Sequence, residues 1–297
     1  MRIVSLLPAA TEILLALGLD EELVGVTELC DVPAALAGVA VVARRPVVAQ
    51  VSSPGPGARL LVVGPTSLVE ADPDLIIGSD LCRVCTAGSR ELRAMAADID
   101  DEVEVLSLDP VSVEGVLNAI QAVGAMTEAE DAAMDVVVGL RERLQAVETI
   151  VVARREHGFV PPRVAALEWL DPPTAVGRWI PEQVRLAGGW ELLGHEGERS
   201  SLTSWEAVRE VDPEILVLMP SNLHLDDTVA AWAATPRPDG WDDLRAVRDG
   251  RVFAMDGAGQ FARPGPRIVD GIEALAEIID PLAFDGMSLP GSWVRVG

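Results

Sequence analysis

Strand-sized apolar runs alternate with helical patterns through the first third of the chain. The expected helix at residues 8–17 opens on Pro8 and ends at Gly18, which are common residues for a helix start and a helix end. The pattern predicts strands over 2–7, 23–27, 75–77 and 102–106, and helices over 8–17 and 89–97. Strands that are separated by helices indicate parallel βαβ units.

The second half of the chain repeats this alternation. It predicts strands over 163–169, 214–219 and 252–255, and helices over 181–187, 204–211 and 268–279. In each half an Asp-Pro pair, Asp72-Pro73 or Asp212-Pro213, follows a helical pattern and precedes an apolar strand. Because proline disfavours helical backbone in the residue before it, both segments predict the same helix–turn–strand unit.

Residues 112–148 carry apolar positions mostly three or four apart, with Gly124 and Thr127 as the points where a bend is expected. A helix of roughly 35 residues would be about 50 Å long, which suits a strut between two lobes. We therefore expect an α/β fold of two Rossmann-like lobes with parallel sheets, joined by a long backbone helix. The expected boundaries are 1–110 for the first lobe, 111–150 for the helix and 151–297 for the second lobe.

Composition narrows the range of partners. The net charge of −24 repels nucleic-acid backbones, and no apolar run reaches the roughly 18 residues of a membrane span. Pro8, Thr11 and Glu12 interrupt the first apolar segment, so no secretory leader is expected and the cytoplasm is the predicted location. Three cysteines, an odd and small number, suit a reducing compartment.

Two of these cysteines, Cys82 and Cys85, stand three residues apart between a strand and a helix. They are open to three interpretations: small buried thiols, a zinc site, or thiols at the edge of a ligand cleft that contact ligand or cycle between redox states. A zinc site needs further ligands, and Cys30 is the only other thiol. No stoichiometric metal is therefore expected.

Aromatic side chains are confined to the second half, since no Phe, Trp or His precedes His157. A flat ligand would therefore stack mainly on the second lobe. The candidates are Trp169 at a strand end, Arg178 and Trp179 after a short loop, and Phe261 in a glycine-rich loop. Core packing of the tryptophans and plain turn geometry of the loop are the alternatives.

The first lobe offers Ser5 and Thr11 beside the start of a helix, where free backbone N–H groups favour ligand oxygens. Helix capping is the alternative for both hydroxyls. The three histidines, His157, His195 and His224, stand apart from one another, so none is expected to hold a metal, although His224 could reach the cleft.

Several segments together resemble the cobalamin-type substrate-binding proteins of ABC importers, which have a rigid helical backbone. The matching segments cover nearly the whole chain and are most similar to a signal-less cytoplasmic branch of that family; they are 5–13, 16–18, 23–27, 30–33, 80–85, 167–172 and 263–267. The resemblance implies a small ligand, a corrinoid such as cobalamin, held in a cleft between the lobes. Arg263 matches a cleft arginine of these relatives, and Glu206 matches one of their two transporter-docking acids.

The chain departs from this pattern at three places. Arg178 replaces the histidine of a Gly-His-Trp segment, Ser221-Asn222 replaces Cys-Gly, and Thr66 stands at the first docking position. The loss of one docking acid weighs against importer docking. We therefore expect a cytoplasmic small-ligand-binding protein that uses Ser5, Thr11, Cys82, Trp169, Arg178, Trp179, Phe261 and Arg263. An enzyme built on the same fold and a module that forms a homodimer remain as alternatives.

Overall fold

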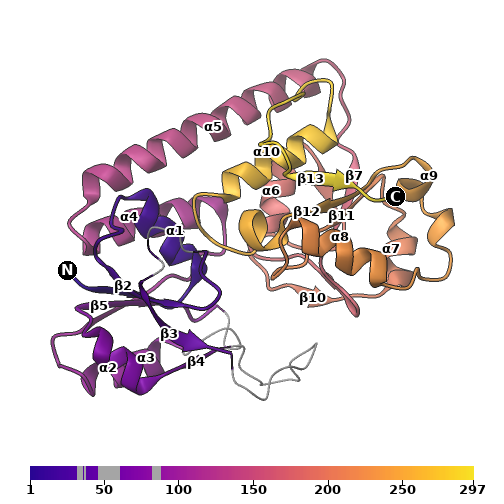
Figure 1. Cartoon of the computed structure of the whole chain (residues 1–297). Coiled ribbons are helices and arrows are strands. Elements are labelled where there is room, and N and C mark those ends of the chain that lie inside the picture. The colour runs from indigo at the N-terminus through magenta and orange to yellow at the C-terminus, as the bar shows by residue number, and fades with distance from the viewer. Residues whose placement is uncertain (32–35, 37, 46–60, 82–87) are drawn as a thin grey trace. The chain divides into compact units, whose positions relative to one another are not determined.

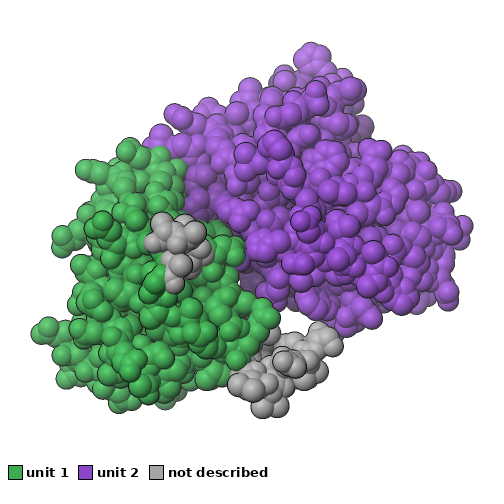
Figure 2. Space-filling model, in the orientation of Figure 1, with its two compact units in different colours: residues 1–110, 117–137 green, residues 111–116, 138–297 purple. Residues whose placement is uncertain are grey.

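The computed structural model describes residues 1–31, 36, 38–45, 61–81 and 88–297. It divides into two compact units (Figure 2), of which unit 1 comprises residues 1–110 and 117–137 and unit 2 comprises residues 111–116 and 138–297. Each unit is built around its own sheet. In the described part of the chain, no helix is both long and apolar enough to cross a membrane.

Unit 1 contains a sheet with the strand order β4-β3-β2-β1-β5-β6 (Figure 1), and only the pairing of β3 with β4 is antiparallel. Its core joins apolar residues of the strands to Leu68 and Leu92 of the helices. The elements are β1 Ile3–Ser5, α1 Pro8–Ala16, β2 Leu23–Thr27, β3 Ala40–Arg44, β4 Val62–Val63, α2 Pro65–Ala71, β5 Leu75–Gly78, α3 Ser89–Ala97 and β6 Glu104–Ser107. The predicted βαβ alternation is confirmed here, with an added antiparallel edge.

Unit 2 contains a sheet with the order β10-β8-β7-β11-β12-β13, in which β9 also pairs with β7. Its centre, β7-β11-β12, is parallel, whereas β8, β10 and β13 are antiparallel additions. The strands are β7 Arg163–Leu170, β8 Pro173–Ala175, β9 Trp190–Glu191, β10 Ser201–Leu202, β11 Ile215–Leu218, β12 Val252–Met255 and β13 Trp293–Arg295. The helices are α6 Ile180–Leu186, α7 Trp205–Val211, α8 Leu225–Ala234, α9 Arg245–Arg248 and α10 Ile268–Ile279.

The predicted long helix is present but begins later than expected. Residues 112–148 do not form one element, because α4 Val113–Met126 ends before α5 Glu130–Glu156 begins. The two helices run antiparallel: Arg141 of α5 pairs with Glu114 of α4, and a Cβ at Gly124 would lie 2.5 Å from the Cβ of Ala133. The long helix is therefore α5, of 27 residues or about 40 Å (Figure 1), and α4 folds back along its start.

The two Asp-Pro segments adopt the same structure in each unit. Asp72 and Asp212 both have left-handed backbone (φ 47° and 38°) and end helices α2 and α7. An arginine at the start of the first strand then donates to the carbonyl of each: Arg2 to Asp72 at 2.8 Å and Arg163 to Asp212 at 2.9 Å. The helix–turn–strand unit predicted in each half is thus confirmed, and the same arginine–carbonyl hydrogen bond occurs in both.

Candidate functional site

The carboxyl ends of β7, β11 and β12 meet at one edge of the unit 2 sheet, because these strands are parallel neighbours. In open α/β sheets, ligands bind at this edge, where the loops that follow the strands converge. Residues 168–170 end β7, and residues 220–224 and 256–267 follow β11 and β12. These segments bring Glu168, His224, Asp256 and Arg267 to this edge.

The first polar group at this edge is formed by Glu168 and Arg178. Burial raises the pKa of the Glu168 carboxyl, while the Ser200 hydroxyl and the positive charge of Arg178 oppose that rise. Burial also lowers the pKa of the Arg178 guanidinium, and the negative charge of Glu168 opposes the fall. The carboxyl of Glu168 and the guanidinium of Arg178 therefore interact electrostatically, and both side chains are partly buried.

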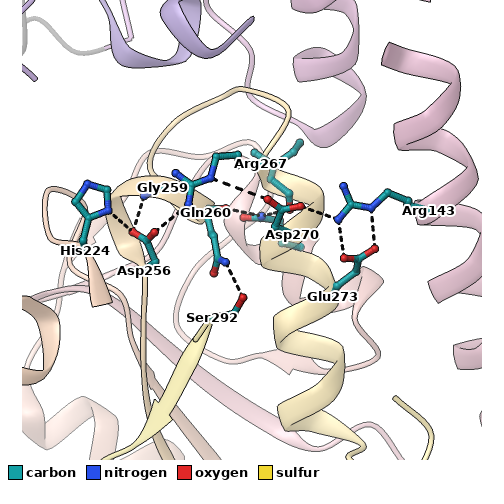
Figure 3. Close-up of polar contacts among 11 residues, drawn as sticks. Arg143, His224, Asp256, Gly259, Gln260, Arg267, Asp270, Glu273 and Ser292 are labelled. Carbon is teal, nitrogen blue, oxygen red and sulfur yellow. Dashed lines mark hydrogen bonds and ion pairs between the residues drawn. The ribbon is translucent and has the colours of Figure 1, made fainter. Parts of the chain in front are cut away.

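The second polar group is centred on Asp256, directly after β12 (Figure 3). Its Oδ1 accepts the backbone N–H of Gly259 at 2.7 Å and lies 3.0 Å from Nδ1 of His224. Its Oδ2 accepts from Nη2 of Arg267 at 3.1 Å. One carboxylate thus fixes the turn that follows β12, the imidazole that follows β11 and the arginine that precedes α10.

The glycine-rich loop predicted at 257–265 is partly helical. Gly257–Phe261 forms a π-helical turn, and the side chain of Asp256 caps it by accepting the N–H of Gly259. Short π-helical turns often occur at functional sites. Arg263 follows this turn in a half-buried position, and its carbonyl accepts from the N–H of Gly265.

An ion-pair cluster of Arg143, Asp270 and Glu273 joins α10 to α5 and is linked to Asp256 through Arg267 (Figure 3). Arg143 of α5 donates to Glu273 through Nε at 2.9 Å and Nη2 at 2.6 Å, and its Nη2 also donates to Asp270 at 2.6 Å. Both carboxylates are nearly buried, with side-chain exposures of 12% for Asp270 and 11% for Glu273. Arg267 approaches Asp270 at 4.0 Å, so the cluster continues to Asp256.

The structure places two of the predicted ligand-stacking residues inside unit 2. Trp179 is 2% exposed and donates its Nε1–H to the carbonyl of Phe261 at 2.7 Å. Phe261 is fully buried. Neither ring presents a face that a ligand could stack on, and so core packing, the alternative interpretation of this tryptophan, accounts for its position. Trp169 differs, because it is only partly buried at the end of β7 and donates to the carbonyl of Asp171.

The predicted hydroxyls of unit 1 are also buried. Thr11 donates to Ser5 at 2.8 Å and lies 3.1 Å from Sγ of Cys30, while Ser5 donates to the carbonyl of Leu7 at 2.9 Å. The two hydroxyls thus form an internal network beside the start of α1, and their predicted contact with ligand stays a prediction. Cys82 and Cys85 lie outside the described residues.

The two positions compared with transporter-docking acids lie at matching places in the two units. Thr66 and Glu206 are each exposed at the second residue of a short helix, α2 or α7. Leu68 and Val208, two residues later, are both buried. Glu206 therefore presents a carboxylate to solvent from unit 2, and the equivalent position of unit 1 presents a hydroxyl.

Sequence reasoning named His224 but missed Asp256 and Arg267. The only signal for Asp256 was its place directly after a predicted strand. Within the described residues no cluster of three or more His, Cys, Asp or Glu side chains could hold a metal ion. His157 is exposed near the end of α5, and His195 is exposed in the loop after β9.

Two α/β units with parallel central strands and a long α5 define the class of two-lobed binding proteins. Residues 3–258 match the periplasmic binding protein family, and the chain belongs to it. The chain is 27% identical over 290 residues to an uncharacterized ABC transporter substrate-binding lipoprotein, YvrC, of Bacillus subtilis, covering 95% of this chain and 81% of the relative.

Solved structures show the same fold. A periplasmic heme binding protein from Pseudomonas aeruginosa is 23% identical with a TM-score of 0.74, over 100% of this chain and 99% of that chain. The periplasmic vitamin B12 binding protein BtuF of Vibrio cholerae is 22% identical with a TM-score of 0.68, over 96% and 98%. The family match confirms the resemblance to substrate-binding proteins of this type. Membership of a signal-less cytoplasmic branch stays a prediction.

Proposed function

We propose that this protein binds one bulky, metal-containing tetrapyrrole-type ligand, a corrinoid or a haem, at the carboxyl edge of the unit 2 sheet. The observation that carries the proposal is the convergence of two polar groups, Glu168 with Arg178 and His224 with Asp256 and Arg267, at this edge in a member of a binding-protein family. The edge combines cations with a partly buried Trp169, which suits a large conjugated ligand with polar substituents.

The similarity to a heme binding protein and to a vitamin B12 binding protein supports this ligand class. At this edge Arg267 is paired with Asp256, so a ligand meets a guanidinium and a carboxylate together. Guanidinium N–H groups donate hydrogen bonds. This arrangement favours a ligand with oxygen-bearing substituents that accept them.

Delivery of the ligand to an ABC transporter is part of this proposal. The relative from Bacillus subtilis is described as a substrate-binding lipoprotein of such a transporter, and Glu206 is exposed on α7. These observations weigh against the sequence-based doubt about docking, which rested on Thr66. A cytoplasmic location and a homodimer stay predictions, which cell fractionation and sedimentation test.

Titration of the purified protein with cyanocobalamin and with haemin, followed by tryptophan fluorescence, tests the ligand class. We expect saturable binding of one of them at one ligand per chain. Arg263→Ala should weaken that binding at least tenfold, about 1.4 kcal/mol, because it removes a cation beside the turn after β12. His157→Ala is the control, since His157 is exposed directly after α5. Normal binding by Arg263→Ala, or an equal loss in His157→Ala, would place the site elsewhere.

A further inference from the structure

His224 is held at the carboxyl edge of the unit 2 sheet by its backbone. It lies in the loop after β11 and stands at the N-cap of α8, where its carbonyl accepts the N–H of Thr228 at 2.8 Å. The carbonyl of the preceding residue, Leu223, accepts the N–H of Ala258 in the π-helical turn at 3.0 Å. The loops after β11 and β12 are therefore bonded to each other, and together they fix the position of His224 beside Asp256.

The contact between His224 and Asp256 determines which ring nitrogen carries the proton. The Asp256 carboxylate binds the guanidinium of Arg267 at 3.1 Å, and its Oδ1 also accepts the N–H of Gly259 at 2.7 Å. Because an ionised carboxylate only accepts hydrogen bonds, Nδ1 of His224, which lies 3.0 Å from Oδ1, is the donor. In the neutral imidazole the lone pair then belongs to Nε2, which points away from Asp256 (Figure 3).

The imidazole reaches the surface while its partner does not. The side chain of His224 is 45% exposed, whereas that of Asp256 is 13% exposed. An imidazole whose second N–H is held by a carboxylate is the usual form of a histidine that ligates a metal. A bare metal ion needs several protein ligands, and the described residues contain no group of three or more His, Cys, Asp or Glu side chains to supply them. A metal inside a tetrapyrrole already has the ring nitrogens as ligands, so one imidazole is enough to bind it.

We propose that Nε2 of His224 binds the iron of a haem as an axial ligand, and that Asp256 positions the imidazole for this bond. This rests on the proposed function and narrows its ligand class, because haem iron takes axial ligands from the protein, whereas the cobalt of cyanocobalamin already has one on each face. Nε2 donates its lone pair to the iron and replaces the water or hydroxide that haemin carries in solution. The hydrogen bond from Nδ1–H to Asp256 makes the imidazole a stronger donor, which stabilises ferric over ferrous iron.

Absorption spectroscopy of the protein with haemin tests the axial ligand. We expect His224→Gln to shift the Soret band of the complex and to weaken haemin binding at least tenfold, because glutamine keeps an N–H donor for Asp256 but has no ring nitrogen for the iron. Imidazole added to the His224→Gln complex should move the band back towards the wild-type position. His195→Gln, which changes an exposed histidine in the loop after β9, is the matched control and should keep the wild-type spectrum and affinity.

The reduction potential of the haem complex tests the positioning role of Asp256. Asp256→Asn removes the negative charge beside Nδ1, so the imidazole becomes a weaker donor and the potential should rise above that of the wild-type complex. Asp226→Asn, which removes an exposed acid of α8, is the control and should leave the potential unchanged. An unchanged potential in Asp256→Asn would overturn this role.

The same Soret band in the wild-type and His224→Gln complexes overturns the inference while the proposed function stands. Binding of cyanocobalamin without binding of haemin has the same consequence. If the wild-type protein binds neither, the proposed function is refuted and the inference falls with it. The potential is measured on variants of other residues, so a folding defect of His224→Gln does not remove the test.

Discussion

Trp179→Ala should lower the free energy of unfolding of unit 2 by about 3–5 kcal/mol, the usual cost of truncating a buried large aromatic side chain. The indole is 2% exposed, and its Nε1–H bonds to the carbonyl of Phe261. The substitution therefore leaves a cavity and removes the hydrogen bond that holds the end of the π-helical turn. Urea unfolding followed by circular dichroism measures this loss.

Trp190→Ala is the control for this prediction, because Trp190 is 62% exposed on β9 and loses little packing. It should change the unfolding free energy by less than about 1 kcal/mol. A Trp179→Ala protein that keeps its stability but loses ligand binding would contradict the buried position. That result would favour the ligand-stacking role expected from the sequence.

Arg143→Met should lower the free energy of unfolding by about 3 kcal/mol, because it leaves Glu273 without the arginine that binds it and Asp270 with only Arg267 at 4.0 Å. Arg143 is the residue of α5 that binds both Asp270 and Glu273 of α10. Its own side chain is 38% exposed, which places the expected loss at the lower end of the range for buried pairs. Urea unfolding at neutral pH measures the effect.

Arg141→Met provides the matched comparison on the same helix. Arg141 pairs with Glu114, and their side chains are 50% and 58% exposed, so solvent screens this pair. Its loss should cost no more than about 0.5 kcal/mol. If the two arginine variants were equally stable, the ion pairs of Arg143 with Asp270 and Glu273 would not hold α10 to α5.

The central elements could be predicted well because recognisable residues mark where each helix or strand begins and ends. The helices at 89–97 and 268–279 and the strand at 252–255 have the expected limits. The short strands β8, β9, β10 and β13, of two or three residues each, are too short for a periodic pattern to reveal. Pairing to neighbours that are already in place, rather than their own composition, makes them strands.

The start of the long helix was mispredicted for a related reason. A straight helix and a helical hairpin show the same apolar periodicity, and only the turn distinguishes them. Gly124 was a sign of the bend, but the reversal depends on its close approach to Ala133 and on the pairing of Glu114 with Arg141. These contacts join residues far apart in the sequence.

The candidate site was predicted by residue type more than by position. Trp169 and Trp179 look alike in the sequence, yet one is partly exposed and the other is core. The bulge at Glu168 and the left-handed backbone of Arg178 arise from pairing with β8 and with the loop at 197–200. Nothing local in the sequence signals either feature. Asp256 was missed because its partners, His224 and Arg267, come from different loops.

Native mass spectrometry of the chain, as purified from its source and after incubation with cyanocobalamin or haemin, tests the central claim most directly. The account predicts a complex with one ligand mass per chain. It also predicts that Arg263→Ala lowers the loaded fraction at the same ligand concentration, whereas His157→Ala does not. A bare chain under all three conditions, or full loading of the Arg263→Ala protein, would contradict ligand binding at the carboxyl edge of the unit 2 sheet.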